Sequence, residues 1–260
     1  MDVEAYLRRI ESDGPRNPSA TTLRGLHRQH LFTVPFENLD IALGTLIRLD
    51  PDALFNKIVT RKRGGFCYEL NGLFHGLLQA LGFRSEMLSA RVARSDGTFS
   101  PEFDHMLLRV DLGEPWIADV GFGDSFLDPL PLRHSNLGLD DAPEFALTQS
   151  SGTWDLVRVQ RDGTHVPQYR FTEASRQFDD FADMCHFHQT SPESHFVQTR
   201  VCSKALPDGR VTVSGMRLIE TRDGERRERE LESHEELREC LQQRFGIEFA
   251  EDTDWSKLAG

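Results

Sequence analysis

The spacing of apolar residues changes near residue 83, and this change limits the fold more than any other feature of the chain. Before it, apolar residues recur every three to four positions, as on one face of a helix. After it they alternate, and turn signals such as Asp96-Gly97 and Arg161-Asp162-Gly163 come every ten to fifteen residues. Helices that come first and strands that follow are typical of an α+β fold.

Four apolar stripes before residue 83 predict helices, at residues 3–10, 23–31, 51–59 and 66–81. The third has Asp50 as N-cap and Pro51 as first helical residue. The fourth has the widest apolar face and ends at Gly82, a typical residue after a helix end. We expect this fourth helix to be deeply buried.

Strand-like runs follow, and one further helix closes the pattern. The runs HMLLRV, WIADV, FALTQ and WDLVRV favour a small β-barrel. Residues 173–198 are irregular or helical in character, and VCSKAL, RVTVSGMRLIE and RRERELE are strand-like again. Ser233 and Glu236 form a capping box for a helix that ends at Gly246. The chain therefore divides into helices, then strands, then strands with a helix.

The composition disfavours several functions. Lys and Arg number 30 and Asp and Glu 42, so the formal net charge is −12 and neither a nucleic acid nor an anionic membrane is expected as partner. No apolar stretch approaches the roughly 18 residues that a membrane-spanning helix needs. The start, MDVEAYLRRI, lacks the features of a secretory signal, so we expect a cytoplasmic protein. The four cysteines form no CxxC pair and are expected to be reduced: Cys67, Cys185, Cys202 and Cys240.

Cys67 has the position of a reactive cysteine. It follows Arg63-Gly64-Gly65-Phe66, in which the glycines can adopt positive φ, and falls in the first turn of the long predicted helix. Unpaired backbone N–H groups and the helix dipole favour a thiolate there. With a cationic neighbour, the pKa of such a thiol can fall to roughly 3.5–7.5. The alternative is a small buried apolar residue, which is the usual fate of an intracellular cysteine.

The strand region offers a base and an orienting acid for this cysteine. His105 opens an alternating run and lies on the face opposite to Met106 and Leu108. Asp119 ends the next run, and adjacent antiparallel strands can bring its carboxylate to one ring nitrogen of His105. The other ring nitrogen is then left for the thiol.

Four motifs make the chain resemble the arylamine N-acetyltransferases. They are His27 and His30 followed by Pro35-Phe36-Glu37-Asn38-Leu39, the segment from Arg63 to Asn71, the strand opening Phe103-Asp104-His105, and the strand end Asp119-Val120-Gly121-Phe122-Gly123. The resemblance runs nearly end to end. It implies a helical domain at 1–83 that carries the nucleophile, a β-barrel domain at 84–190 that carries the histidine and the aspartate, and an α/β lid at 191–260, with a core like that of cysteine proteases.

The resemblance also implies an enzyme. Cys67, His105 and Asp119 would be the catalytic triad of a ping-pong reaction, in which acetyl-CoA acetylates the cysteine and an arylamine, arylhydrazine or N-hydroxyarylamine then takes the acetyl group. Acetyl-CoA is the implied co-substrate, and no metal is implied. The expected contacts with CoA or the acceptor are Phe36, Phe103, Phe122, Gly123 and Ser214. The physiological amine, the preferred acyl chain and the oligomeric state are left open.

Other interpretations of the same residues stay open. The order Cys, His, Asp also fits a thiol hydrolase or a transglutaminase-like enzyme, and a non-catalytic binding protein would have an unreactive Cys67. The best metal-like cluster, which matches no standard zinc spacing, is Cys185, His186, His188 and His195. His27 and His30 are expected to be structural, with hydrogen-bonded rings, rather than metal ligands.

Charged residues near the nucleophile suggest two further roles. Arg63 and Glu37 are expected to form an ion pair that holds the Cys67 turn. The cations available for the phosphates of CoA are Arg61, Lys62, Arg63, Arg91 and Arg94.

Overall fold

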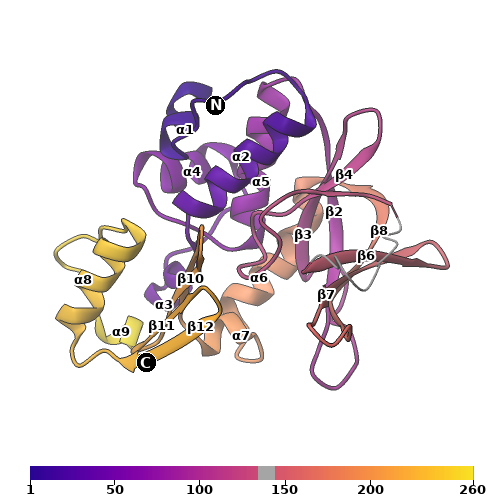
Figure 1. The fold of residues 1–260 in the computed structure, drawn as a ribbon. Helices are drawn as coiled ribbons and strands as arrows, with labels where there is room; N and C mark the ends of the chain where they lie inside the picture. The colour runs from indigo at the N-terminus through magenta and orange to yellow at the C-terminus, as the bar shows by residue number, and fades with distance from the viewer. Residues whose placement is uncertain (134–143, 260) are drawn as a thin grey trace.

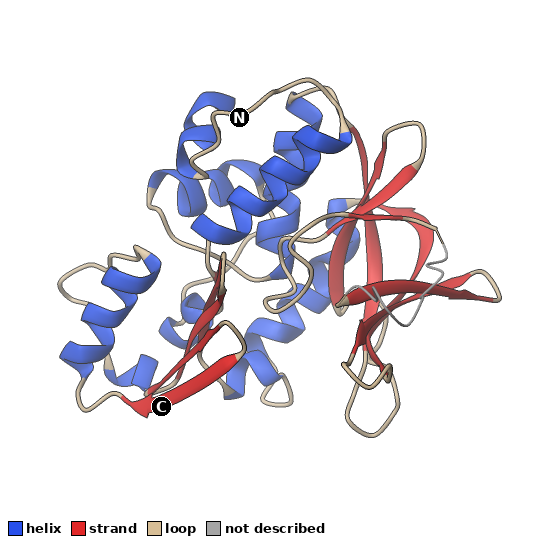
Figure 2. Cartoon of the chain, viewed as in Figure 1, coloured by secondary structure: helices blue, strands red, loops and turns tan. Residues whose placement is uncertain are grey.

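The computed structural model describes residues 1–133 and 144–259. Figure 1 shows a helical part at the top, a strongly curved sheet to the right, and a smaller sheet with α8 (His234–Phe245) at the lower left. Figure 2 shows the same separation of helices and strands by colour.

The helical part follows the four predicted stripes and adds one short helix, at residues 39–43, that no stripe predicted. Its helices are α1 (Val3–Arg9), α2 (Ala20–Thr33), α3 (Leu39–Leu43), α4 (Pro51–Phe55) and α5 (Cys67–Ala80). The side chains of Asp2, Ser19 and Asp50 cap α1, α2 and α4, and each accepts a hydrogen bond from a backbone N–H of the first turn. The predicted helix over 51–59 differs after Phe55, where it becomes a π-helical turn, η1 (Asn56–Thr60), in which Lys57 is buried.

Seven strands among the described residues form the curved sheet, in the order β5-β4-β3-β2-β8-β7-β6 and with antiparallel neighbours. They are β2 (Arg84–Val92), β3 (His105–Asp111), β4 (Pro115–Ala118), β5 (Leu130–Pro131), β6 (Phe145–Ser150), β7 (Thr153–Val159) and β8 (His165–Arg176). Successive side chains of β3 point to opposite faces of the sheet and so contribute to two different hydrophobic cores. Met106 and Leu108 join the core that contains α5, whereas Leu107 joins the core inside the curved sheet.

The smaller sheet has the order β1-β9-β10-β11-β12. Its strands are β1 (Phe36–Glu37), β9 (Val201–Leu206), β10 (Gly209–Ser214), β11 (Arg217–Arg222) and β12 (Glu225–Glu230). Leu237 and Leu241 of α8 pack on it, and Ser233 caps α8 as predicted. Because β1 lies early in the chain and pairs with β9, this sheet reaches the region of the nucleophile.

Short helices connect the two sheets: η2 (Phe178–Phe181), a 3-10 turn, followed by α6 (Ala182–Thr190) and α7 (His195–Gln198). A last short helix, α9 (Ser256–Ala259), follows α8. The predicted α+β class is confirmed. The division at residues 83 and 190 stays a prediction, and parts of its second and third segments, residues 134–143 and 260, lie outside the described residues. Within the described chain, no helix has both the length and the apolar character that crossing a bilayer requires.

Candidate active site

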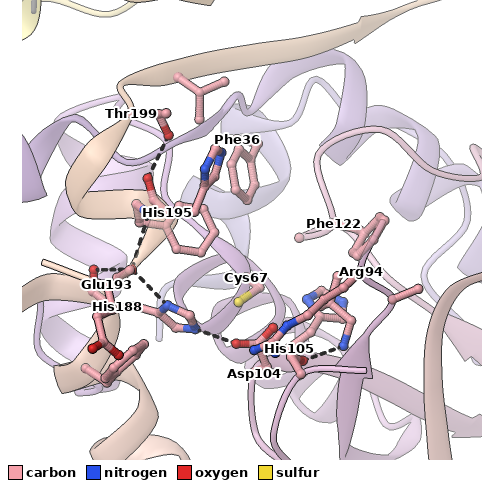
Figure 3. A pocket seen from close by; sticks show the side chains of 18 of the residues that line it. Phe36, Cys67, Arg94, Asp104, His105, Phe122, His188, Glu193, His195 and Thr199 are labelled. Carbon is pink, nitrogen blue, oxygen red and sulfur yellow. Dashed lines mark hydrogen bonds and ion pairs between the residues drawn. The ribbon is translucent and has the colours of Figure 1, made fainter. Parts of the chain in front are cut away.

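A cleft of about 900 Å³ lies where α5 meets both sheets and the α6–α7 segment, and Cys67 is part of its wall (Figure 3). Cys67 is the first residue of α5, as predicted, and only 3% of it is exposed. Four phenylalanines also line the cleft: Phe36, Phe122, Phe187 and Phe196. The nucleophile candidate is therefore buried in protein on one side and faces, on the other, a cavity whose walls carry several aromatic rings.

Gly64 and Gly65 shape the Cys67 turn by close packing. Neither has a positive φ, so the conformational role predicted from the sequence is wrong. A Cβ on Gly64 would lie 2.0 Å from the carbonyl oxygen of Pro35, and a Cβ on Gly65 would lie 2.8 Å from the Cβ of Glu69. Glycine is needed here because the backbone before Cys67 lies directly against these two neighbours.

His105 and Asp119 form a buried pair. The Nε2 of His105 lies 2.8 Å from Oδ2 of Asp119, and their side chains are 3% and 0% exposed. His105 lines the cleft together with Cys67, whereas Asp119 lies behind it. The ring of His105 is held edge-on by Phe122, at 5.1 Å between centroids, and tilted against Tyr169, at 5.2 Å. The structure therefore brings the three predicted triad residues to one place.

Asn71, one turn after Cys67 on α5, ties these elements together. Its Nδ2 donates to the Met106 carbonyl at 2.7 Å and to Oδ1 of Asp119 at 2.9 Å. Its Oδ1 accepts from the backbone N–H of Val120 at 3.0 Å. The sequence motif contains Asn71, but no local pattern assigned it this role.

His27 fixes the same loop from the side of α2. Its Nε2 accepts a hydrogen bond from the backbone N–H of Asp119 at 3.1 Å, so Nδ1 carries the proton and donates to the Leu127 carbonyl at 2.8 Å. The ring also stacks on Phe126. His27 is thus structural with a hydrogen-bonded ring, as expected, whereas the expectation of a hydrogen-bonded His30 ring is wrong among the described residues, because apolar and aromatic neighbours surround it.

The buried groups of the site have shifted pKa values. Burial raises the pKa of Asp119, but His105, Asn71 and the Gly121 N–H together hold it below its usual value, so the carboxylate stays ionised. Burial raises the pKa of the Cys67 thiol well above its ordinary value, although the Met106 N–H lowers it. Burial thus opposes the ionisation that a helix start favours, and the thiol needs a base beside it.

A buried ionic cluster supports the Cys67 turn. Arg63 pairs with Glu37 and with Asp40, each at 2.8 Å, which confirms the predicted Arg63–Glu37 pair. Lys57 pairs with Asp40 at 2.9 Å and with Glu69 at 2.8 Å, and Glu69 also accepts from the Phe66 N–H. Burial raises the pKa of Glu69 to about 7, with the charge of Lys57 opposing it. These charges are paired, so removal of one leaves another buried without compensation.

The predicted contact residues separate into two groups. Phe36, Phe122 and Ser214 line the cleft. Phe103 does not: its ring packs edge-on against Phe181, at 5.3 Å, because the chain at Phe103 turns its side chain away from the cleft. Gly123 is also outside the lining and lies against the ring of Phe36.

Several cleft residues were missed by the sequence analysis, notably Asp104, His188, Ser194 and Phe196. Asp104 stood beside His105 in the motif, and His188 was considered only as a metal ligand. His188 instead lies 3.1 Å from Asp104. Of the five cations suggested for phosphate, Arg94 lines the cleft. No group of three or more His, Cys, Asp or Glu side chains suited to a metal occurs within residues 1–133 and 144–259.

Comparison with known proteins first shows the class of protein to which the chain belongs. A sequence model of a family described as N-acetyltransferase matches residues 19–253. A Salmonella typhimurium protein named arylamine N-acetyltransferase / N-hydroxyarylamine O-acetyltransferase is 34% identical over 249 residues, which are 94% of this chain and 88% of that protein. The arylamine N-acetyltransferase of Mycolicibacterium smegmatis is 34% identical over 258 residues, which cover 96% and 94% of the two chains.

Solved structures agree with this class over the whole chain. The arylamine N-acetyltransferase of M. tuberculosis superposes with a TM-score of 0.90 at 31% identity and covers 100% of both chains. That of Mycobacterium marinum, solved in complex with CoA, has a TM-score of 0.89 at 30% identity and covers 99% of this chain and 97% of its own. The chain belongs to the arylamine N-acetyltransferase family and is an acetyltransferase enzyme.

Proposed function

We propose that this enzyme transfers an acetyl group from acetyl-CoA to the nitrogen of an arylamine, an arylhydrazine or an N-hydroxyarylamine, through an acetyl-Cys67 intermediate. One observation carries the proposal: Cys67 shares the wall of an aromatic cleft with His105, whose other side is bonded to the buried carboxylate of Asp119. The CoA complex of the M. marinum relative supports the donor, and the names of the relatives support the acceptor.

The cleft suits such substrates in shape and charge. Phenylalanine rings on its walls offer apolar contact for an aromatic acceptor. Arg94 is the cation among the described lining residues that faces a polyanionic donor in a chain of net charge −12. At physiological salt the Debye length is about 8 Å, so a local arginine matters more than the distant total charge.

In the first half-reaction, Cys67 attacks the thioester carbonyl carbon of acetyl-CoA. His105 takes the thiol proton, because burial makes the free thiolate unfavourable, and Asp119 stabilises the imidazolium. The carbon–sulfur bond to CoA then breaks, and the CoA thiolate leaves with the proton from His105. The N–H of Cys67, at the start of α5, is the expected donor to the oxyanion.

In the second half-reaction, the acceptor nitrogen attacks the acetyl-cysteine. The nitrogen–carbon bond forms, the carbon–sulfur bond breaks, and His105 takes the proton that the nitrogen loses. Aromatic amines are largely unprotonated at neutral pH and so remain nucleophilic.

The test separates the two half-reactions. Incubation with acetyl-CoA alone should release CoA and add one acetyl group, which peptide mass spectrometry should locate on Cys67. A subsequent aromatic amine should remove it and yield the N-acetyl product. Cys67→Ala should abolish both steps, whereas Cys240→Ala, on the buried face of α8 far along the chain, should retain them.

Two results would contradict the proposal. Release of CoA that yields only acetate, with any aromatic amine present, would identify a thioester hydrolase instead. Full turnover by the Cys67→Ala variant would exclude the acetyl-cysteine intermediate.

A further inference from the structure

A second histidine–carboxylate pair faces the same cleft. The Nε2 of His188, on α6, lies 3.1 Å from Oδ1 of Asp104, the residue just before β3. The Nδ1 of His188 lies 3.2 Å from the hydroxyl of Ser194, and the His188 ring meets Phe196 edge-on at 5.1 Å. Figure 3 shows the Asp104–His188 contact in the cavity into which the Cys67 sulfur points. The proposed triad does not use this pair.

The backbone that presents Asp104 is strained and firmly held. Phe103 has φ of +67°, a left-handed conformation that is costly for a phenylalanine. Two partly buried hydrogen bonds maintain it: the Phe103 N–H donates to the Ser89 hydroxyl at 2.7 Å, and the Tyr68 hydroxyl donates to the Phe103 carbonyl at 2.7 Å. This conformation turns the Phe103 ring away and leaves Asp104 on the cleft wall.

The Asp104 carboxylate is charged and partly open. Its side chain is 18% exposed, against 0% for Asp119. Burial raises its pKa, but His188 and Ser100 hold the pKa below the ordinary value. The same negative charge raises the pKa of Cys67. An acid at this position therefore hinders ionisation of the nucleophile. We expect it to favour a different step of the reaction, the transfer to the acceptor.

We propose that Asp104 binds the acceptor nitrogen and that His188 is the positioning residue that fixes its carboxylate. This inference rests on the proposed function and names a further residue for its second half-reaction. As the neutral nitrogen attacks acetyl-Cys67, it becomes positively charged, and its N–H groups become stronger donors. Asp104 accepts one of these hydrogen bonds and stabilises that charge until His105 takes the proton. The thiolate of Cys67 leaves as before, so Asp104 gains no proton overall.

Other ionisable groups surround this part of the cleft and bear on its pH dependence. They are Cys67 and Tyr68 on α5, His105 on β3, Asp119 behind His105, Arg94 after β2, His188 on α6, and Glu193 and His195 at the start of α7. Of these groups, His188 lies in contact with the Asp104 carboxylate, at 3.1 Å, so substitution of either residue tests this pair.

The Asp104→Asn variant tests the inference, because it keeps the shape and removes the charge. Rapid mixing with acetyl-CoA measures the acetylation of Cys67, and addition of an aromatic amine to the acetylated enzyme measures the transfer. We expect transfer to slow about ten- to a hundred-fold, the range for a lost hydrogen bond to a charged group. Acetylation should not slow, and its pH profile should move to lower pH because the opposing charge is gone.

Two further variants make the outcome decisive. His188→Gln keeps a donor for Asp104 and should lose less of the transfer rate than Asp104→Asn. Glu102→Gln removes a neighbouring exposed charge outside the cleft and should change neither half-reaction. Equal slowing of both half-reactions in Asp104→Asn, or no slowing of transfer, overturns the inference. Failure of the unaltered enzyme to acetylate Cys67 would instead refute the proposed function. If Asp104→Asn does not fold, His188→Gln decides by the same comparison.

Discussion

Asn71→Leu is expected to uncouple the acid of the proposed triad from the helix that carries the nucleophile. Leucine has a similar volume but loses hydrogen bonds to the Met106 carbonyl, the Val120 N–H and the Asp119 carboxylate. Met106 and Val120 are 0% and 2% exposed, so water cannot replace Asn71 there. A buried polar group that loses its partner costs about 1–3 kcal/mol. Two such groups lower the free energy of unfolding by about 2–6 kcal/mol.

Urea unfolding measures this loss, and stopped-flow acetylation under folding conditions measures the effect on chemistry. The acetylation rate should fall as well, because Asp119 loses a donor that keeps it ionised and oriented toward His105. Gln79→Leu makes the same kind of change at an exposed position of the same helix and should alter stability by no more than about 0.5 kcal/mol. If Asn71→Leu were as stable and as fast as Gln79→Leu, Asn71 would not hold the site together.

Three further changes test other parts of the structure. Gly64→Ala should lower the free energy of unfolding by about 3 kcal/mol, because the new Cβ would meet the Pro35 oxygen. Gly25→Ala, in open space on α2, should raise it by about 0.5–1 kcal/mol. Equal melting temperatures of the two variants would contradict this. Lys57→Met should lower the free energy of unfolding by about 3–5 kcal/mol, because two buried carboxylates lose their cation. Addition of Glu69→Gln should restore part of this loss in urea unfolding. If it restores nothing, the ionic cluster does not stabilise the fold in this way. Neither ring nitrogen of His30 has a hydrogen-bond partner among the described residues, and burial holds the pKa of His30 well below 6.5. The contribution of His30 to stability is therefore present above pH 6.5 and is lost as the pH falls below 6.5. The free energy of unfolding should fall by up to about 1.4 kcal/mol per pH unit in this range, and His30→Leu should make this dependence on pH weaker. An unchanged slope in His30→Leu would show that His30 is not its source.

Local patterns in the sequence were sufficient for α1, α2, α5 and α8 and for the start of α4. Asp50-Pro51 and the Ser233 capping box mark real helix starts because side-chain caps act within three residues. Gly82, at φ of +85°, follows the end of α5 as predicted. The location of Cys67 at the first position of α5 depended on the same kind of local signal.

Long-range contacts were beyond such patterns. The π-helical turn after Phe55 buries Lys57 against carboxylates on two other helices, so tertiary charge pairing overrides the helical stripe there. Phe103 was expected in the cleft, but a left-handed backbone turns its ring away, and no property of phenylalanine predicts that conformation. The partner of Asp104 comes from a helix after the whole curved sheet, and only the folded chain shows it.

Two histidine–aspartate pairs in one cleft differ in their surroundings, and this difference separates their roles. Asp119 is closed off, and Asn71 and the Gly121 N–H occupy its second oxygen, so it can act only on the ring of His105. Asp104 is partly open and can meet a ligand. A fully buried carboxylate can orient and stabilise a catalytic base, whereas a partly exposed carboxylate can bind a nitrogen that gains positive charge. Asp119→Asn should therefore slow both half-reactions, because His105 takes a proton in each, whereas Asp104→Asn should slow only the transfer to the acceptor.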